Sequence, residues 1–350
     1  MSECANDIIT LLCRLGERSL AAGSTILSYI HHTSEKYNVK KHILCNRWVN
    51  TVSFSSDTNQ WTLLTQHKQR NNDVVFDDEL ASGSLSVESF TCSFMFNCSG
   101  YYNYDAGYTP SFPGVEKYTG LLVHPQHWPK DLDYTNKKVV IIGSGATAVT
   151  LLPAMADKVK HITMLQRSPT YIASVSLIDP VATFLHSIPF LPTKWAHFLI
   201  RWKNILGTML IFWQAKTWPS LTKKYLKHEI KSYLGSESTC DVEKHFSPSY
   251  DPWDQRLCAV PDNDFFKAIK EGKADVVTDQ IDTFTESGIK LKDSKEELSA
   301  DIVITATGLV LQLFGGVKMF IDGKPVDMTN TRVYKGVMLS NIPNAAMSVG

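Results

Sequence analysis

The 350-residue sequence lacks the features that mark disulfide-rich, zinc-binding or nucleic-acid-binding proteins. Its 35 basic and 35 acidic residues balance, so no overall field attracts nucleic acid. Its seven cysteines are odd in number and include no C-x-x-C pair, which argues against a disulfide framework, a zinc knuckle or a redox pair. What the chain does have is 43% hydrophobic residues, enough for a large core, and a length that fits about two domains.

Long uncharged apolar runs are also missing. The N-terminus offers only residues 8–13 as an apolar run, preceded by Glu3 and Asp7, so we predict no signal peptide. Residues 184–218 are rich in aromatic and aliphatic side chains, but their longest uncharged stretch, 204–215, is shorter than the ~20 residues that cross a bilayer. We predict a buried or partly exposed helical layer there, with peripheral membrane contact as the lesser alternative. The expected protein is reduced, soluble and cytoplasmic.

Local patterns predict an α/β chain. Residues 101–136 are rich in Tyr, Pro and Gly and are expected to form an ordered connection, whereas residues 175–250 have helical composition. A strand, a helix and a second strand at 138–166 form a unit of the usual crossover size. The predicted helices are 24–37 and 146–156, and the predicted strands are 48–54, 61–66, 94–97, 138–142, 161–166, 275–277, 289–291 and 302–305.

The strongest local signal is a glycine-rich loop between a predicted strand and a predicted helix. It has the pattern G-x-G-x-x-A and comprises Gly143, Ser144, Gly145, Ala146, Thr147 and Ala148. Gly143 permits the tight turn, Gly145 lets the backbone approach a pyrophosphate, and Ala148 lets helix and strand pack closely. Free N–H groups at the helix start, with the helix dipole, hold the anion. The loop predicts a dinucleotide site; the alternative is an ordinary glycine turn.

The end of the next predicted strand indicates which dinucleotide is bound. Enzymes that use NAD place an Asp or Glu there, about 20 residues on, for the ribose hydroxyls. This sequence instead has Gln166, Arg167 and Ser168, without a carboxylate. The guanidinium of Arg167 suits a phosphate, and the hydroxyl of Ser168 can donate to one. We therefore predict NADPH rather than NADH, with a solvated surface role for Arg167 as the alternative.

A second motif lies upstream of the loop. It has the form Y-x-G-x-x-x-H-x-x-x-W-P and consists of Tyr118, Gly120, His124, Trp128 and Pro129. The string resembles the F-x-G-x-x-x-H-x-x-x-W-P fingerprint of Baeyer–Villiger monooxygenases, within the flavin-containing monooxygenase family, and Tyr118 is its only departure. The chain most resembles the bacterial subgroup that activates thioamide prodrugs. The resemblance implies that His124 and Trp128 fix the linker between domains, with acid–base chemistry at His124 as the minor alternative.

Two further segments resemble the same family. Thr307 and Gly308 end a strand similar to the family's A-T-G strand, where the chain returns to the flavin domain. The Asp-Pro-Trp-Asp-Gln-Arg segment that ends at Arg256 matches the region of the family's active-site arginine. The resemblance therefore gives Arg256 the catalytic role of stabilising a peroxide anion. A structural ion pair with Asp251 or Asp254 is the alternative.

The resemblance implies an FAD- and NADPH-dependent monooxygenase. NADPH at the glycine-rich loop would reduce FAD, and the reduced flavin would take up O₂ to form a peroxyflavin that oxygenates a ketone or a sulfur compound. Small molecules of these classes and O₂ are the expected partners, without nucleic acid and with at most peripheral membrane contact. No metal site is expected. A two-nucleotide disulfide reductase would share the fold class but requires a spaced cysteine pair.

The expected fold is α/β, with a doubly wound, Rossmann-type NADP domain inserted in a truncated FAD-domain remnant. We expect residues 1–105 to be a partial FAD domain, 106–308 the NADP domain with a helical insertion at about 175–250, and 309–350 the return into a C-terminally truncated FAD domain. No G-x-G-x-x-G loop for the FAD pyrophosphate occurs before position 143. Two hypotheses follow for this chain: a monooxygenase, or a non-catalytic NADP-binding or interaction protein derived from that family.

Overall fold

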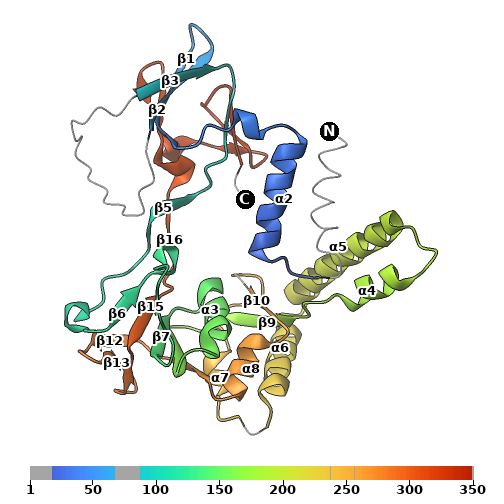
Figure 1. Ribbon diagram of the computed structural model, residues 1–350, viewed down its shortest axis with the longest axis vertical. Helices are drawn as coiled ribbons and strands as arrows, with labels where there is room; N and C mark the ends of the chain where they lie inside the picture. Colours follow the sequence, from blue (N-terminus) through green and yellow to red (C-terminus); the bar gives the residue numbers. More distant parts are fainter. Residues whose placement is uncertain (1–17, 68–86, 237, 256, 349–350) are drawn as a thin grey trace. The chain divides into compact units, whose positions relative to one another are not determined.

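The computed structural model describes residues 18–67, 87–236, 238–255 and 257–348 (Figure 1). The chain divides into two compact units. The first comprises Met1–Tyr37 with Tyr108–Gly308, and the second comprises Asn38–Gly107 with Leu309–Gly350.

The first unit is built on a five-stranded parallel sheet with the order β11-β8-β7-β15-β6. From β7 the chain crosses to β8 and later to β11 on one side, whereas β15 pairs with the other side of β7. The strand order therefore reverses between β7 and β15, and open α/β sheets bind ligands beyond the carboxyl ends of their strands at such a point. The predicted α/β, Rossmann-type class is confirmed. The strands are β6 (Leu121–Val123), β7 (Lys138–Ile142), β8 (His161–Gln166), β11 (Ala274–Thr278) and β15 (Ile302–Thr305).

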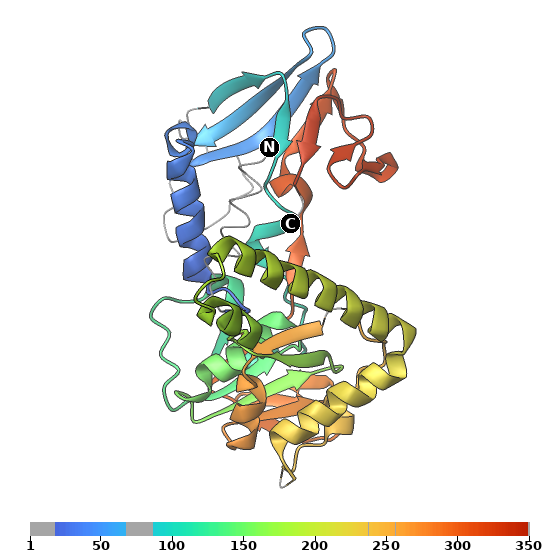
Figure 2. The ribbon, with the colours of Figure 1, turned by 90° about the vertical axis from the view of Figure 1, so that its right-hand side faces the viewer.

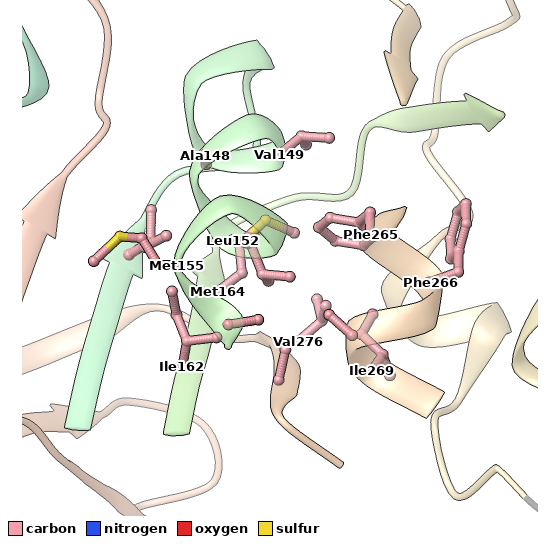
Figure 3. Packing of buried hydrophobic residues seen from close by; sticks show 14 of the residues in the cluster. Ala148, Val149, Leu152, Met155, Ile162, Met164, Phe265, Phe266, Ile269 and Val276 are labelled. Atoms are coloured by element: carbon pink, nitrogen blue, oxygen red, sulfur yellow. The ribbon is translucent and has the colours of Figure 1, made fainter. Parts of the chain in front are cut away.

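Both faces of this sheet are covered, and its central strands β8, β7 and β15 are accordingly buried along most of their length. Helices α3 and α8 cover one face, where Leu152, Met164 and Phe265 belong to one buried cluster (Figure 3). An antiparallel three-stranded sheet, β12-β13-β14, covers the other face and packs Phe284 and Ile289 against Val140. The covering elements are α3 (Ala146–Ala156), α8 (Asp264–Lys270), β12 (Ile281–Phe284), β13 (Gly288–Leu291) and β14 (Glu297–Ser299).

Four further helices, α4 to α7, lie between two short strands, β9 and β10, that pair in parallel. Asp179 begins α4 by accepting hydrogen bonds from the backbone N–H groups of Val181 and Ala182. Pro219 separates α5 from α6, because proline cannot continue a helix but suits the first turn of the next one. No helix in the described part of the chain is long and apolar enough to cross a membrane. These elements are β9 (Tyr171–Val175), α4 (Pro180–Ser187), α5 (Thr193–Thr217), α6 (Pro219–Leu234), α7 (Val242–His245) and β10 (Leu257–Pro261), and α2 (Gly23–Lys36) precedes them.

The second unit contains a five-stranded sheet with the order β18-β17-β1-β2-β3, in which β1 and β17 are parallel and the other pairs antiparallel. Its core surrounds Trp61, whose indole N–H lies 3.1 Å from the carbonyl oxygens of both Pro343 and Asn344. Shorter pairs join β4 to β21, β5 to β16 and β19 to β20. The strands are β1 (Arg47–Ser55), β2 (Gln60–His67), β3 (Val87–Cys92), β4 (Met95–Asn97), β5 (Tyr102–Gly107), β16 (Leu309–Leu311), β17 (Lys318–Ile321), β18 (Lys324–Pro325), β19 (Val333–Tyr334), β20 (Met338–Leu339) and β21 (Ala345–Met347).

Short 3₁₀ turns complete both units. They are η1 (Lys40–His42), η2 (Val115–Lys117), η3 (Pro125–His127), η4 (Leu313–Gly316) and η5 (Met328–Asn330).

Candidate functional site

The glycine-rich loop lies at the switch point of the parallel sheet, between the end of β7 and the start of α3. Gly143 has a φ of +132°, which L side chains rarely adopt. A Cβ atom at this position would overlap the carbonyl oxygen of Ala306, in the loop that follows β15. The loops after β7 and β15 therefore approach each other so closely at Gly143 that only glycine fits there.

Gly145 is constrained by a different requirement. It caps α3 with a φ of −78°, and a Cβ built on it would meet no heavy atom within 4 Å. Ala146 and Thr147 continue the exposed first turn, and among the described residues no side chain caps the N–H groups of this turn. Ala148 is fully buried against the core. The loop thus combines a packed base with an open upper side, at a helix start that favours an anion.

The end of β8 lies beside this loop. The hydroxyl of Ser144 donates a hydrogen bond of 3.1 Å to the carbonyl oxygen of Ser168, which ties the two segments together. Arg167 is exposed, and it forms no ion pair with any carboxylate in the described residues. The structure therefore brings Ser144, Arg167 and Ser168 to the same edge of the sheet. Within the described residues, no carboxylate neutralises the guanidinium of Arg167 there.

Gln166 holds the end of β8 in place, a role that the sequence pattern did not predict. Its side chain is buried, and its amide nitrogen donates to the carbonyl oxygen of His245 at 2.8 Å and to the hydroxyl of Thr278 at 2.9 Å. Burial lowers the pKa of His245, whose Nδ1 lies 2.8 Å from the same hydroxyl. The sequence did contain a signal for this role, namely a polar residue at the end of an apolar strand. A buried amide needs hydrogen-bond partners, so such a residue is expected to bind neighbouring segments.

Asp279 follows β11 at the same edge of the sheet, and its backbone N–H donates to the carbonyl oxygen of Gln166. Burial by itself would raise the pKa of Asp279. Hydrogen bonds from the backbone N–H groups of Ser294, Asp293 and Gln280 outweigh this effect and lower the pKa to about 2. The carboxylate therefore joins the turn after β11 to the turn between β13 and β14.

The fingerprint residues Tyr118 and Gly120 fit against each other. The Tyr118 hydroxyl donates to the carbonyl oxygen of Ala300 at 3.1 Å, and burial, with a contribution from Asp301, raises the pKa of Tyr118 to about 12. The tyrosine ring lies over Gly120, so that a Cβ at position 120 would overlap the ring and the carbonyl oxygen of Asp301. Tyr118 and Gly120 therefore hold the segment before β6 against the two residues that connect β14 to β15.

His124 and Trp128 have structural contacts. His124 Nδ1 accepts a hydrogen bond from the backbone N–H of Gln126, so the neutral ring carries its proton on Nε2. That nitrogen is buried without a hydrogen-bond partner in the described part of the chain, and burial lowers the pKa of His124. The rings of Trp128 and Tyr134 meet edge to face, with centroids 6.4 Å apart. The carbonyl oxygen of Pro129 accepts a hydrogen bond from the backbone N–H of Leu132. The role of these residues at a linker stays a prediction.

Thr307 and Gly308 lie where β15 ends. The hydroxyl of Thr307 donates to the carbonyl oxygen of Tyr108 at 2.6 Å, and the N–H of Tyr108 donates to the carbonyl of Gly308 at 3.1 Å. Gly308 has a φ of +119°. The two segments that enter and leave the first unit are thus joined by reciprocal hydrogen bonds.

Arg256 lies outside the described residues, so its catalytic role stays a prediction. The two acidic residues considered as its ion-pair partners both have lysine partners. Asp251 lies 2.6 Å from Lys223, and Asp254 lies 2.5 Å from Lys216. This segment is therefore bound to helices α5 and α6 through two ion pairs.

The parallel sheet and its glycine-rich loop define a Rossmann-type dinucleotide-binding unit. A model of the family described as flavin-binding monooxygenase-like matches residues 19–349. EthA of Mycobacterium tuberculosis, an FAD-containing monooxygenase, is 48% identical over 350 residues, which are 99% of this chain and 67% of EthA. AlmA of Acinetobacter baylyi, a probable FAD-binding monooxygenase, is 44% identical over 332 residues, or 95% of this chain and 62% of AlmA.

Among solved structures, a steroid monooxygenase bound to NADP superposes with a TM-score of 0.68 at 16% identity, over 94% of this chain and 66% of that one. This likeness shows a shared fold. Together with the family model and the relatives, it confirms the assignment that the fingerprint suggested: the chain belongs to the flavin-binding monooxygenase-like family.

Proposed function

We propose that this chain binds NADPH at residues 143–148 as part of an FAD- and NADPH-dependent monooxygenase that acts on ketones or sulfur compounds. One observation carries the proposal: an open glycine-rich loop at the switch point stands beside the uncommitted guanidinium of Arg167. A cofactor with a pyrophosphate and a further phosphate matches both features. Family membership supplies the reaction class.

The residues of the loop have distinct roles in this proposal. The open side of Gly145 admits the pyrophosphate, and the uncapped N–H groups of α3 hold it. Arg167 binds the additional phosphate, and the bond between Ser144 and Ser168 keeps the two segments at a fixed distance. When bound, NADPH supplies a hydride, and FAD supplies the means of activating O₂.

FAD enters the proposal through the family alone. The sequence has no second glycine-rich loop of the G-x-G-x-x-G type, so we assign no residue of this chain to the flavin pyrophosphate. The ketone and sulfur substrates and the role of Arg256 likewise follow from the resemblance. We place the reaction in a reducing compartment such as the cytoplasm, because the seven cysteines are odd in number and include no C-x-x-C pair.

The test is a calorimetric titration of the full chain with NADPH and with NADH. The wild type should prefer NADPH, and Arg167→Asp should weaken NADPH binding by about 10–100-fold while sparing NADH, because a charge-assisted phosphate contact is lost. Arg332→Asp, which removes an exposed arginine of the second unit, is the matched control and should behave like the wild type.

Two outcomes separate the hypotheses for this chain. A purified protein with flavin absorbance that oxidises NADPH with O₂ would establish the monooxygenase. A colourless protein that binds NADPH without turnover would instead establish the NADP-binding or interaction protein. Equal affinity of the wild type for NADPH and NADH would refute the role of Arg167.

A further inference from the structure

An exposed apolar stripe runs along helix α5. It consists of six side chains spaced three or four residues apart, each at least 46% exposed. They are Trp195, Phe198, Trp202, Leu206, Met209 and Trp213, and together they are called the α5 stripe below. Because an α-helix repeats every 3.6 residues, this spacing places all six on one side of the helix. With 25 residues, α5 is about 37 Å long.

Burial along α5 is confined to two small residues near its ends. Ala196 and Ala215 are the only buried residues of the helix, with exposed fractions of 0% and 1%. Figure 2 shows α5 as one continuous helix that is followed directly by α6. The aromatic members of the stripe also support one another, since Phe198 contacts Trp195 at 5.9 Å and Trp202 at 6.2 Å. The stripe is therefore an ordered surface whose side chains stay at least 46% exposed in the described part of the chain.

Charge indicates what kind of surface would cover it. Residues 180–228 contain no Asp or Glu but seven Lys and Arg residues. Four of the seven are paired with carboxylates outside this range. The other three, Lys194, Arg201 and Lys224, are exposed and form no ion pair with the described carboxylates. The stripe is thus accompanied by uncompensated positive charge.

We propose that the α5 stripe docks the protein onto anionic phospholipid bilayers, with α5 lying in the plane of the interface. Tryptophan and flanking cations are the residues that favour this position, where the apolar side enters the acyl boundary and the cations meet headgroups. The helix cannot span a bilayer, since no described helix is long and apolar enough. A second copy of the chain is a poorer occupant, because it would bring a second surface with the same uncompensated positive charge to the contact.

The test is flotation of the full-length chain with vesicles of phosphatidylglycerol and phosphatidylcholine, compared with phosphatidylcholine alone. The anionic vesicles should carry the protein, and binding should weaken with salt. Trp202→Glu combined with Met209→Glu should weaken vesicle binding about tenfold or more, because the apolar contact is lost. Lys194→Glu combined with Arg201→Glu should weaken binding to the anionic vesicles by a similar factor, because the attraction to the headgroups is lost. Tyr334→Glu, at an apolar side chain that is 61% exposed in the second unit, is the matched control.

A second measurement needs no variant. Brominated acyl chains should quench the tryptophan fluorescence of the wild type, because three of the six stripe residues are tryptophans. The proposal is overturned if anionic vesicles do not carry the wild type, or if phosphatidylcholine vesicles carry it equally well. It is also overturned if the variant with Trp202→Glu and Met209→Glu binds as before while its melting temperature is unchanged. Self-association that the same variant abolishes, without vesicle binding, would identify a second copy as the occupant and would also overturn it.

Discussion

Two glycines of the same loop are expected to respond differently to the same substitution. Gly143→Ala forces an L residue to a φ of +132°, at a cost of about 1–2 kcal/mol. The new methyl group also overlaps the carbonyl oxygen of Ala306, and overpacking of this kind costs about 1–3 kcal/mol. The free energy of unfolding of Gly143→Ala should therefore fall by about 2–5 kcal/mol.

Gly145→Ala should leave stability nearly unchanged. Its φ of −78° suits any residue, and the added methyl group meets no heavy atom within 4 Å. The remaining cost is that of replacing glycine by alanine at a helix cap, below about 1 kcal/mol. The same methyl group occupies the space through which a pyrophosphate approaches the backbone, so NADPH should bind about tenfold more weakly or worse.

The assay compares melting temperatures without ligand and dissociation constants for NADPH by calorimetry. For a unit of this size, Gly143→Ala should lower the melting temperature by roughly 5–15 °C and Gly145→Ala by a few degrees at most. A folded Gly145→Ala variant that binds NADPH like the wild type would refute the pyrophosphate site. A Gly143→Ala variant that melts like the wild type would refute the close approach of the two loops.

Three further substitutions test the surroundings of the site. Gln166→Leu leaves its buried partners unpaired, so urea unfolding should show a loss of about 1–3 kcal/mol, and paired titrations should show a weaker preference for NADPH over NADH. For Asp279, the folded-state pKa of about 2 lies below the usual value of about 3.9, so its stabilising effect is present above pH 4 and is lost as the pH falls to 2. Asp279→Asn should accordingly cost at most about 2 kcal/mol at pH 7, and unfolding curves recorded from pH 7 to pH 2 should converge with those of the wild type; a constant difference would contradict the assignment. Tyr118→Phe removes the bond to Ala300 and should cost about 1 kcal/mol without changing NADPH affinity. Because the pKa of Tyr225 is also raised to about 12, ultraviolet titration of the variant should show one phenol fewer ionising near pH 12 than titration of the wild type.

The strand–helix–strand unit around the glycine-rich loop was predictable from the sequence to the residue. The predicted bounds 138–142, 146–156 and 161–166 coincide with β7, α3 and β8. All the information for these elements is local, because β-branched runs, a glycine loop and a helix of small and aliphatic residues follow one another directly. The parallel class of the sheet followed from the same short crossover.

Elements that depend on distant partners were missed. Strands β9 and β10 pair residues 171–175 with 257–261, and no local pattern announces such a pairing. The segment 101–136 was predicted to be a connection, yet it contributes β5 and the edge strand β6. A strand of three residues such as β6 is too short for periodicity to show, and its partner β15 lies some 180 residues further along the chain.

The fingerprint identified the family more specifically than any other segment, yet its side chains hold backbone in place. Tyr118 lies over Gly120, and Trp128 packs on Tyr134. His124 is a partly buried ring whose lowered pKa favours the neutral form, which makes it a poor source of charge at neutral pH. A motif can therefore be diagnostic because it preserves a particular packing of one segment against a sheet. What distinguishes a coenzyme must instead be sought where polar groups have no partner within the protein, and the exposed guanidinium of Arg167, which forms no ion pair with the described carboxylates, is the group that we propose for this role.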